Sequence, residues 1–178
     1  MQITFIRHLP TEWNKKGMLQ GRRDIEIMPL SNELEKGIIH NQQYLKKLFP
    51  FDIVLSSGLK RTQQTAEVYG YMCEVETLLD ELDFGSFEGR SKEELLKAYG
   101  TQWLEEPKAI GLGENVAQLE ERIISFIKKY KHFSNILVFG HGSWIRAMIS
   151  YSLFSHINQM NKVNVENNAC FTLLVNRE

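Results

Sequence analysis

The sequence predicts an α/β fold: a single domain over residues 1–178, built as a three-layer α/β/α sandwich with a mostly parallel central sheet and helices on both faces. Short apolar runs at 2–6, 52–56 and 136–139 have the length of buried strands. Longer segments with helical periodicity separate them, and strands that alternate with helices favour parallel pairing. A chain of 178 residues that is 43% hydrophobic can bury one core of this kind.

The helices follow from capping residues and apolar stripes. Ser31, Ser57 and Ser143 stand where N-cap side chains belong, and Ser91 opens a capping-box pattern with Glu94. The expected helices span residues 31–49, 59–68, 91–99, 114–130 and 143–153. Residues 73–78 are an expected edge strand, and Cys170–Val175 form the last strand. Residues 9–30 and 79–90 are expected loops, and residues 107–113 a turn-rich link.

Composition restricts the class of partner. The net charge of −1 gives no basic field for nucleic acid, and no apolar run approaches the ~18 residues that span a membrane. Cys73 and Cys170 form no metal or disulfide motif and are expected as buried thiols in a reducing compartment. The expected location is therefore cytoplasmic, and the sequence leaves the oligomeric state open.

Two of the expected strands end on histidines. Arg7-His8 follows the first apolar run, and Gly140-His141-Gly142 ends the run at 136–139. In open α/β sheets the ligand crevice lies outside the carboxyl ends of the strands. If the two strands are neighbours, both histidines face one crevice beside Arg7. Such a crevice suits an anionic substrate and a nitrogen nucleophile.

Two further segments contain charged residues that could belong to the same site. Arg61 lies in the first turn of an expected helix, where a cation opposes the helix dipole, so a functional reason is expected, although an exposed arginine is the alternative. Glu81 lies in the acidic loop 79–90. A phosphate dianion beside one such carboxyl would raise its proton affinity and suit it to general-acid catalysis. The alternative is a solvated acidic loop.

Taken together and in this order, the segments resemble the histidine phosphatase superfamily, a phosphoglycerate-mutase-like family with an Arg-His-Gly signature. The resemblance covers essentially the whole chain. The matching elements are Arg7-His8 with Thr11 and Asn14, Gln20-Gly21, the run 56–66, the run 81–89 and Gly140-His141-Gly142. Glu88 belongs to the pattern and is expected to be structural rather than catalytic.

The resemblance implies a role for each matching residue. His8 would be the nucleophile that takes the phosphoryl group, and Glu81 the general acid and then the base for water. Arg7, Arg61 and His141 would stabilise the transition-state charge, and the backbone after Gly140 would add hydrogen bonds. The expected substrate-binding residues are Arg7, Asn14, Gln20, Gly21, Arg61, His141 and Gly142.

No cofactor or metal is expected. His8, His141 and Glu81 are metal-ligand types, but Arg7 and Arg61 would repel a dication. The chain departs from the family pattern at Leu9, which replaces the usual glycine and is expected to narrow the pocket or shift the backbone beside His8.

Three functions remain open: a phosphatase, a mutase, or a phosphate-sensing domain without catalysis. Gly89 and His141 are only 141 − 89 = 52 positions apart, and mutases of the family are typically longer. We therefore expect a phosphatase whose partner is a small-molecule phosphomonoester. Trp103, Pro107 and Lys108 are expected in the roof of the pocket, and Trp13 and Phe84 are expected either in its wall or, more commonly for buried aromatics, in the core. Sugar phosphates, phosphoglycerate, nucleoside phosphates and a ribazole phosphate suit it equally, and four nearby acids mildly disfavour highly anionic substrates: Asp80, Asp83, Glu105 and Glu106.

Overall fold

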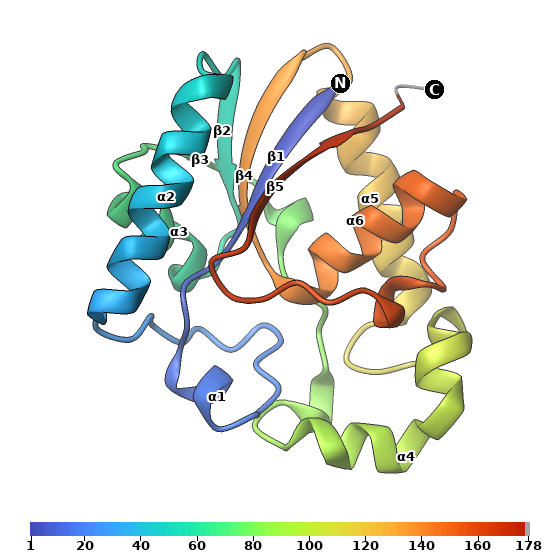
Figure 1. Cartoon of the computed structure of the whole chain (residues 1–178). Coiled ribbons are helices and arrows are strands. Elements are labelled where there is room, and N and C mark those ends of the chain that lie inside the picture. The colour runs from blue at the N-terminus through green and yellow to red at the C-terminus, as the bar shows by residue number, and fades with distance from the viewer. Residues whose placement is uncertain (177–178) are drawn as a thin grey trace.

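A five-stranded sheet with the order β3-β2-β4-β1-β5 lies at the centre of the computed structural model, which describes residues 1–176 (Figure 1). All neighbouring strands are parallel except β5, which runs antiparallel to β1. The strands are β1 (Gln2–Arg7), β2 (Ile53–Ser56), β3 (Glu74–Val75), β4 (Asn135–Gly140) and β5 (Cys170–Leu174). The predicted fold class, with its mostly parallel central sheet, is confirmed.

Helices pack on both faces of this sheet, and Figure 1 shows α2 and α3 on one side with α5 and α6 on the other. Short α1 and kinked α4 lie instead beyond the end of the sheet where β1 and β4 stop (Figure 1). The helices are α1 (Glu12–Lys15), α2 (Asn32–Leu48), α3 (Lys60–Tyr69), α4 (Lys92–Glu105), α5 (Val116–Tyr130) and α6 (Gly142–Phe154). Within residues 1–176, none of them combines the length and the apolar character needed to cross a membrane.

Alternation along the strands divides the core between the two faces. Ile3 and Phe5 of β1 belong to the apolar cluster that includes residues of α5 and α6. Ile6, the next residue along β1, belongs to the cluster that includes residues of α2 and α3. Both faces are therefore buried, which explains why β1 and β4 are continuous apolar runs in the sequence.

The register of β1 and β4 positions the functional residues. The two strands pair in parallel from Gln2 with Asn135 to Arg7 with Gly140. The next residue of each chain segment is therefore a histidine, and His8 N donates to Gly140 O at 3.0 Å. The expectation that the two histidines leave neighbouring strands at the same end of the sheet is met by this register.

Three expected elements are wrong in extent. The edge strand expected at 73–78 is limited to Glu74–Val75, because its partner β2 ends at Ser56 and a 3₁₀ turn begins at Thr77. The helix expected at 91–99 continues to Glu105 through a kink at Gly100, whose φ is +52°. The loop expected at 9–30 contains α1, because Thr11 and Asn14 form a capping box.

Two expected helix caps are also wrong, and both serines have other partners. The N-cap of α3 is Leu59, and the hydroxyl of Ser57 instead lies 2.6 Å from His141 Nε2. The N-cap of α6 is His141, so Ser143 lies inside the first turn, and its N–H donates to Glu81. The caps expected at Ser31 and Ser91 are confirmed.

Candidate active site

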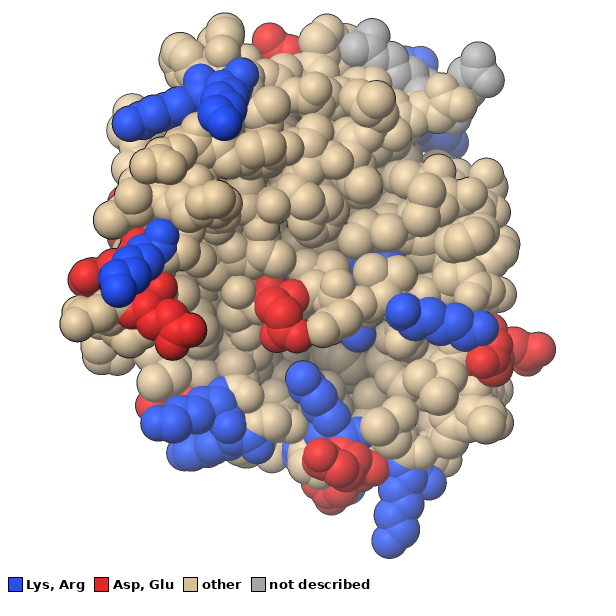
Figure 2. Space-filling model, in the orientation of Figure 1, with Lys and Arg blue, Asp and Glu red and all other residues tan. Residues whose placement is uncertain are grey.

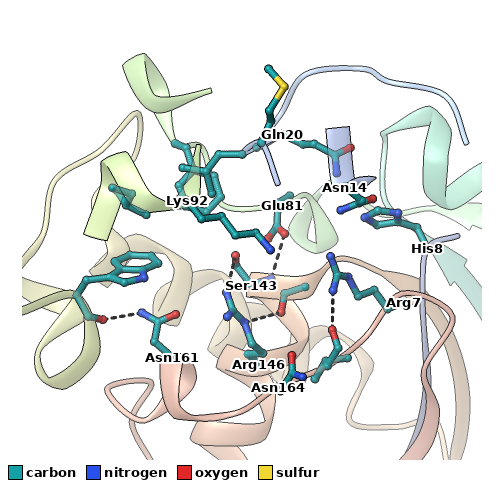
Figure 3. A pocket seen from close by; sticks show the side chains of 18 of the residues that line it. Arg7, His8, Asn14, Gln20, Glu81, Lys92, Ser143, Arg146, Asn161 and Asn164 are labelled. Carbon is teal, nitrogen blue, oxygen red and sulfur yellow. Dashed lines mark hydrogen bonds between the residues drawn. The ribbon is translucent and has the colours of Figure 1, made fainter. Parts of the chain in front are cut away.

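A cavity of about 280 Å³ opens at the carboxyl ends of β1 and β4. Figure 2 shows this side of the molecule, with a hollow below the centre and charged side chains at its rim. Eight of the nine site residues expected from the sequence line the cavity: Arg7, His8, Asn14, Gln20, Gly21, Arg61, Glu81 and Gly142. Figure 3 shows Arg7, His8, Asn14, Gln20 and Glu81 around it, from the end of β1, from α1 and the loop after it, and from the acidic loop.

His8 is held with one ring nitrogen free. Its side chain is buried, and Nδ1 donates to Leu9 O at 2.7 Å, which places the proton on Nδ1 and leaves the Nε2 lone pair available. Burial, followed by the charges of Arg61 and Arg7, lowers the pKa of His8 well below 6.5. The ring is therefore neutral at pH 7, as a nitrogen nucleophile must be.

Arg7 and Arg61 are both close enough to depress the pKa of His8, and each keeps a buried donor without a partner in the described chain. Arg7 Nη1 donates to Val165 O at 2.6 Å, while Arg61 donates to Gly21 O and Arg23 O, both at 2.7 Å. The Nε atoms of both arginines are buried without a hydrogen-bond partner among residues 1–176. Arg61 is buried, not exposed, and burial lowers its pKa to about 10.

His141 lies behind the cavity rather than on its wall. It is fully buried, and its ring centroid is 5.4 Å from that of His8. Ser57 Oγ is 2.6 Å from Nε2, whereas Nδ1 has no partner in the described part of the chain. Burial and the nearby charge of Arg61 lower the pKa of His141 well below 6.5, so this ring is also neutral at pH 7.

Glu81 bridges the acidic loop and the first turn of α6. Oε2 accepts from Ser143 N at 3.0 Å, and Oε1 accepts from Trp144 N at 3.1 Å and from Leu82 N at 2.9 Å. The backbone N–H groups after Gly140 were expected to add hydrogen bonds to the phosphoryl group. Two of them, those of Ser143 and Trp144, donate to Glu81 instead. With a single partner, Oε2 keeps a lone pair that can carry a proton. Glu81 is buried, so the solvated-loop alternative is wrong at this position.

The loop after α1 supplies backbone acceptors to Arg61, and Glu88 holds it in place. Glu88 Oε1 accepts from Arg22 N at 2.8 Å, and Oε2 lies 3.2 Å from Arg23 Nε. Gly21 adopts a φ of +52°, and a Cβ there would lie 2.0 Å from Glu88 Oε1. The structural interpretation of Glu88 thus accounts for its contacts, and a side chain at position 21 would be strained at this φ and would displace Glu88.

Leu9 does not narrow the cavity. Its side chain is fully buried in the cluster with α2 and α3, on the face of the sheet away from α6. Its backbone N–H donates to Thr65 Oγ1 at 2.9 Å, and its carbonyl holds His8 Nδ1. The residue is also absent from the non-glycine positions with positive φ. The expected narrowing of the pocket is therefore wrong, and the alternative, a shift of the backbone beside His8, stays a prediction.

Several residues of the cavity wall were not predicted from the sequence. Arg146 follows Gly142 by four positions on α6, so helical periodicity alone places both on one face. Lys92 is the first residue of α4, where a cation opposes the helix dipole, the same signal that Arg61 gives. Further lining residues without a sequence signal are Met18, Asn161, Asn164 and Val165.

Other expected neighbours lie elsewhere. Phe84 and Trp103 line the cavity, but Trp13 packs over Gly89, and Lys108 pairs with Glu120. Pro107 is also absent from the lining, as are the four acids expected near it: Asp80, Asp83, Glu105 and Glu106. The expected penalty against highly anionic substrates therefore has no basis in the cavity wall.

Comparison with known proteins agrees with this geometry. Residues 3–178 match the family described as histidine phosphatase superfamily (branch 1). The chain belongs to this superfamily. A protein of Hydrogenobacter thermophilus, provisionally named phosphoserine phosphatase 2, is 30% identical over 159 residues, covering 83% of this chain and 76% of that protein.

A named mutase and a solved structure are also similar to this chain. A 2,3-bisphosphoglycerate-dependent phosphoglycerate mutase of Cytophaga hutchinsonii is 26% identical over 171 residues, covering 84% of this chain and 76% of the mutase. The solved structure of the open reading frame Rv3214 from Mycobacterium tuberculosis superposes with a TM-score of 0.81 at 26% identity, covering 96% of this chain and 89% of that one. Phosphatases and mutases are thus both among its relatives.

Proposed function

We propose that the protein is a phosphatase that hydrolyses a small phosphomonoester through a phosphohistidine intermediate on His8, without a metal ion. The observation that carries the proposal is the set of three buried nitrogens without partners in residues 1–176 around His8: Arg7 Nε, Arg61 Nε and His141 Nδ1. Buried polar groups are almost always hydrogen-bonded. Arg7 and Arg61 line the cavity, and the His141 ring centroid lies 5.4 Å from that of His8, so an anion bound at His8 is the proposed acceptor for these donors. Asn14 and Gln20 border the same cavity as further ligands.

The proposed first step transfers the phosphoryl group to the protein. His8 Nε2 attacks phosphorus as the bond between phosphorus and the ester oxygen breaks, and the leaving oxygen takes a proton from Glu81. Arginine matches phosphate oxygens with two donors, so Arg7 and Arg61 stabilise the charge that spreads over the equatorial oxygens. His141 Nδ1 adds a donor from behind, with its ring fixed by Ser57.

The proposed second step returns the site to its starting state. A water molecule attacks the phosphorus of phospho-His8 and gives its proton to the Glu81 carboxylate as the bond to Nε2 breaks. Inorganic phosphate then leaves. A mutase would instead return the phosphoryl group to another oxygen of the same substrate.

Cys73 and Cys170 are both free thiols, which supports the expected cytoplasmic location.

The test is phosphate release from a panel of phosphomonoesters in the presence of EDTA. We expect release by the wild type that is lost in His8→Ala and kept in His132→Ala, because His132 is an exposed histidine that lies against Phe133 and outside the cavity wall. Isomerisation of phosphoglycerates much faster than phosphate release would contradict hydrolysis. Release by His8→Ala at the wild-type rate would contradict the nucleophile.

A further inference from the structure

Two arginines hold the backbone at Glu81, and neither of them lines the cavity. Arg122, on α5, donates through Nη1 to Leu78 O at 2.9 Å and to Asp80 O at 2.7 Å. Arg22, in the loop after α1, donates through Nε to Glu81 O at 3.4 Å. The peptide carbonyl groups on either side of the Glu81 Cα atom are therefore both bound by a guanidinium.

One carboxylate pairs with both of these arginines. Glu114 Oε1 lies 2.7 Å from Arg122 Nη2, and Glu114 Oε2 lies 2.8 Å from Arg22 Nη2. Neither arginine forms another ion pair within residues 1–176. Only 12% of the Glu114 side chain and 15% of the Arg122 side chain are exposed, so solvent screens this pair less than a surface pair. The orientation of both guanidinium groups thus depends on Glu114.

The backbone before α5 also lies directly against the acidic loop. Gly113 N and Glu114 N both donate to Asp83 O, at 3.1 and 3.2 Å. A Cβ at Gly113 would lie 1.9 Å from Asp83 Oδ1, so the two segments leave no space between them. Glu114 therefore contacts the loop that carries Glu81 through its main chain, and through Arg22 and Arg122 with its side chain.

The Glu81 side chain is consequently fixed at both ends. Its carboxyl group accepts from three backbone N–H groups, those of Leu82, Ser143 and Trp144. Its backbone is held by the two arginines that Glu114 orients. A general acid delivers a proton only within hydrogen-bond reach of the leaving oxygen, and a misplacement of about 1 Å can reduce a rate about 100-fold. Such fixing at both ends suits a carboxyl group whose position determines the rate.

We propose that Glu114 is a positioning residue: through Arg22 and Arg122 it fixes the backbone of Glu81 where the carboxyl group can protonate the leaving oxygen. The inference rests on the proposed function, because it assumes that Glu81 is the general acid. Glu114 itself does not line the cavity and has no contact with the reacting atoms.

Phenyl phosphate and p-nitrophenyl phosphate isolate the general acid. The two esters have the same phosphoryl group, but phenolate takes a proton as it leaves, whereas nitrophenolate leaves without one. A displaced Glu81 therefore lowers kcat/KM mainly for phenyl phosphate. A disturbance of Arg61, whose acceptors Gly21 and Arg23 flank Arg22, lowers kcat/KM for both esters alike. The measured quantity is the selectivity ratio, kcat/KM for p-nitrophenyl phosphate divided by kcat/KM for phenyl phosphate.

Two variants remove the fixing contacts. Glu114→Gln removes the charge and retains the shape of the side chain, and we expect it to raise the selectivity ratio about 10- to 100-fold. Arg22→Met should raise the ratio by less, because Arg122 keeps its hold on the loop. Since 41% of the Arg22 side chain is exposed, this second variant decides the question where Glu114→Gln does not fold.

Glu120→Gln is the matched control. Glu120 is on α5, pairs with Lys108, and has 14% of its side chain exposed. In the described chain its carboxylate accepts from Lys108 and Ile157 and from no residue of the acidic loop. This substitution should lower the free energy of unfolding and leave the selectivity ratio unchanged. A wild-type ratio in Glu114→Gln, or in Arg22→Met where Glu114→Gln does not fold, would overturn the positioning role, as would an equal rise in Glu120→Gln.

Glu81→Gln separates this inference from the proposed function. It should raise the selectivity ratio more than Glu114→Gln does, because it removes the proton donor itself. A wild-type ratio in Glu81→Gln, or no phosphate release from either ester by the wild type, would overturn the proposed function rather than the role of Glu114.

Discussion

Replacing Ser57 by alanine tests whether its hydroxyl positions His141. Both side chains are fully buried, and Ser57 Oγ is 2.6 Å from His141 Nε2 and 2.8 Å from Thr62 Oγ1. In Ser57→Ala, Thr62 keeps its hydrogen bond to Leu59 O at 2.8 Å. His141 would then have no partner at either ring nitrogen within the described chain.

The substitution also removes the acceptor of the part-buried Leu59 N–H, 3.1 Å from Ser57 Oγ, but the magnitude follows mainly from the buried His141 nitrogen. A buried polar atom that loses its partner costs about 1–3 kcal/mol, so Ser57→Ala should lower the free energy of unfolding by that amount. For a chain of this size, each kcal/mol shifts Tm by about 2–4 °C. We also expect kcat to fall about 10- to 100-fold, because a ring no longer fixed in orientation stabilises the transition state poorly.

The adjacent serine is a matched control. Ser56 is equally buried, but its Oγ has no hydrogen-bond partner in residues 1–176, so Ser56→Ala should leave stability unchanged or slightly raise it. Urea unfolding gives the free energies, and phosphate release gives kcat. Equal destabilisation by the two substitutions, or a Ser57→Ala enzyme with wild-type kcat, would refute the reasoning.

Two further predictions concern proton transfer and pH. Glu81→Gln should lower kcat for alkyl phosphates about 10²- to 10⁴-fold. It should lower kcat for p-nitrophenyl phosphate much less, because nitrophenolate leaves without a proton. Equal losses of kcat on both esters would contradict the general-acid role of Glu81. The lowered pKa values of His8 and His141 mean that the unfolded chain binds more protons below pH 6.5. Stability should therefore fall as pH drops below that value, by up to about 1.4 kcal/mol per pH unit for each histidine, with a smaller slope in His8→Ala during urea unfolding.

The sequence predicts the fold and the positions of the site residues well where one local rule is enough. Continuous apolar runs identify β1 and β4, and the histidine after each is placed by the parallel register. Arg61 stands against the helix dipole, and the structure places its buried guanidinium on the cavity wall. These signals depend on residues near one another in the chain.

The remaining features could not be predicted because they depend on contacts between distant segments. Ser57 and Ser143 have the pattern of helix caps, but tertiary partners take the Ser57 hydroxyl and the Ser143 N–H. The direction of the Leu9 side chain depends on which face of the sheet α2 and α3 cover. Lys92 gives the same dipole signal as Arg61, yet only the fold shows that α4 lies across the cavity from β1.

The central claim is that His8 carries the phosphoryl group. The most direct measurement is rapid mixing of the enzyme with a ³²P-labelled substrate, alkaline denaturation within milliseconds, and mass spectrometry of the resulting peptides. We predict one acid-labile, base-stable phosphoryl group on the peptide that contains His8, and none in His8→Ala. Phosphate release with no labelled protein at any mixing time, or a label on another residue, would contradict the account.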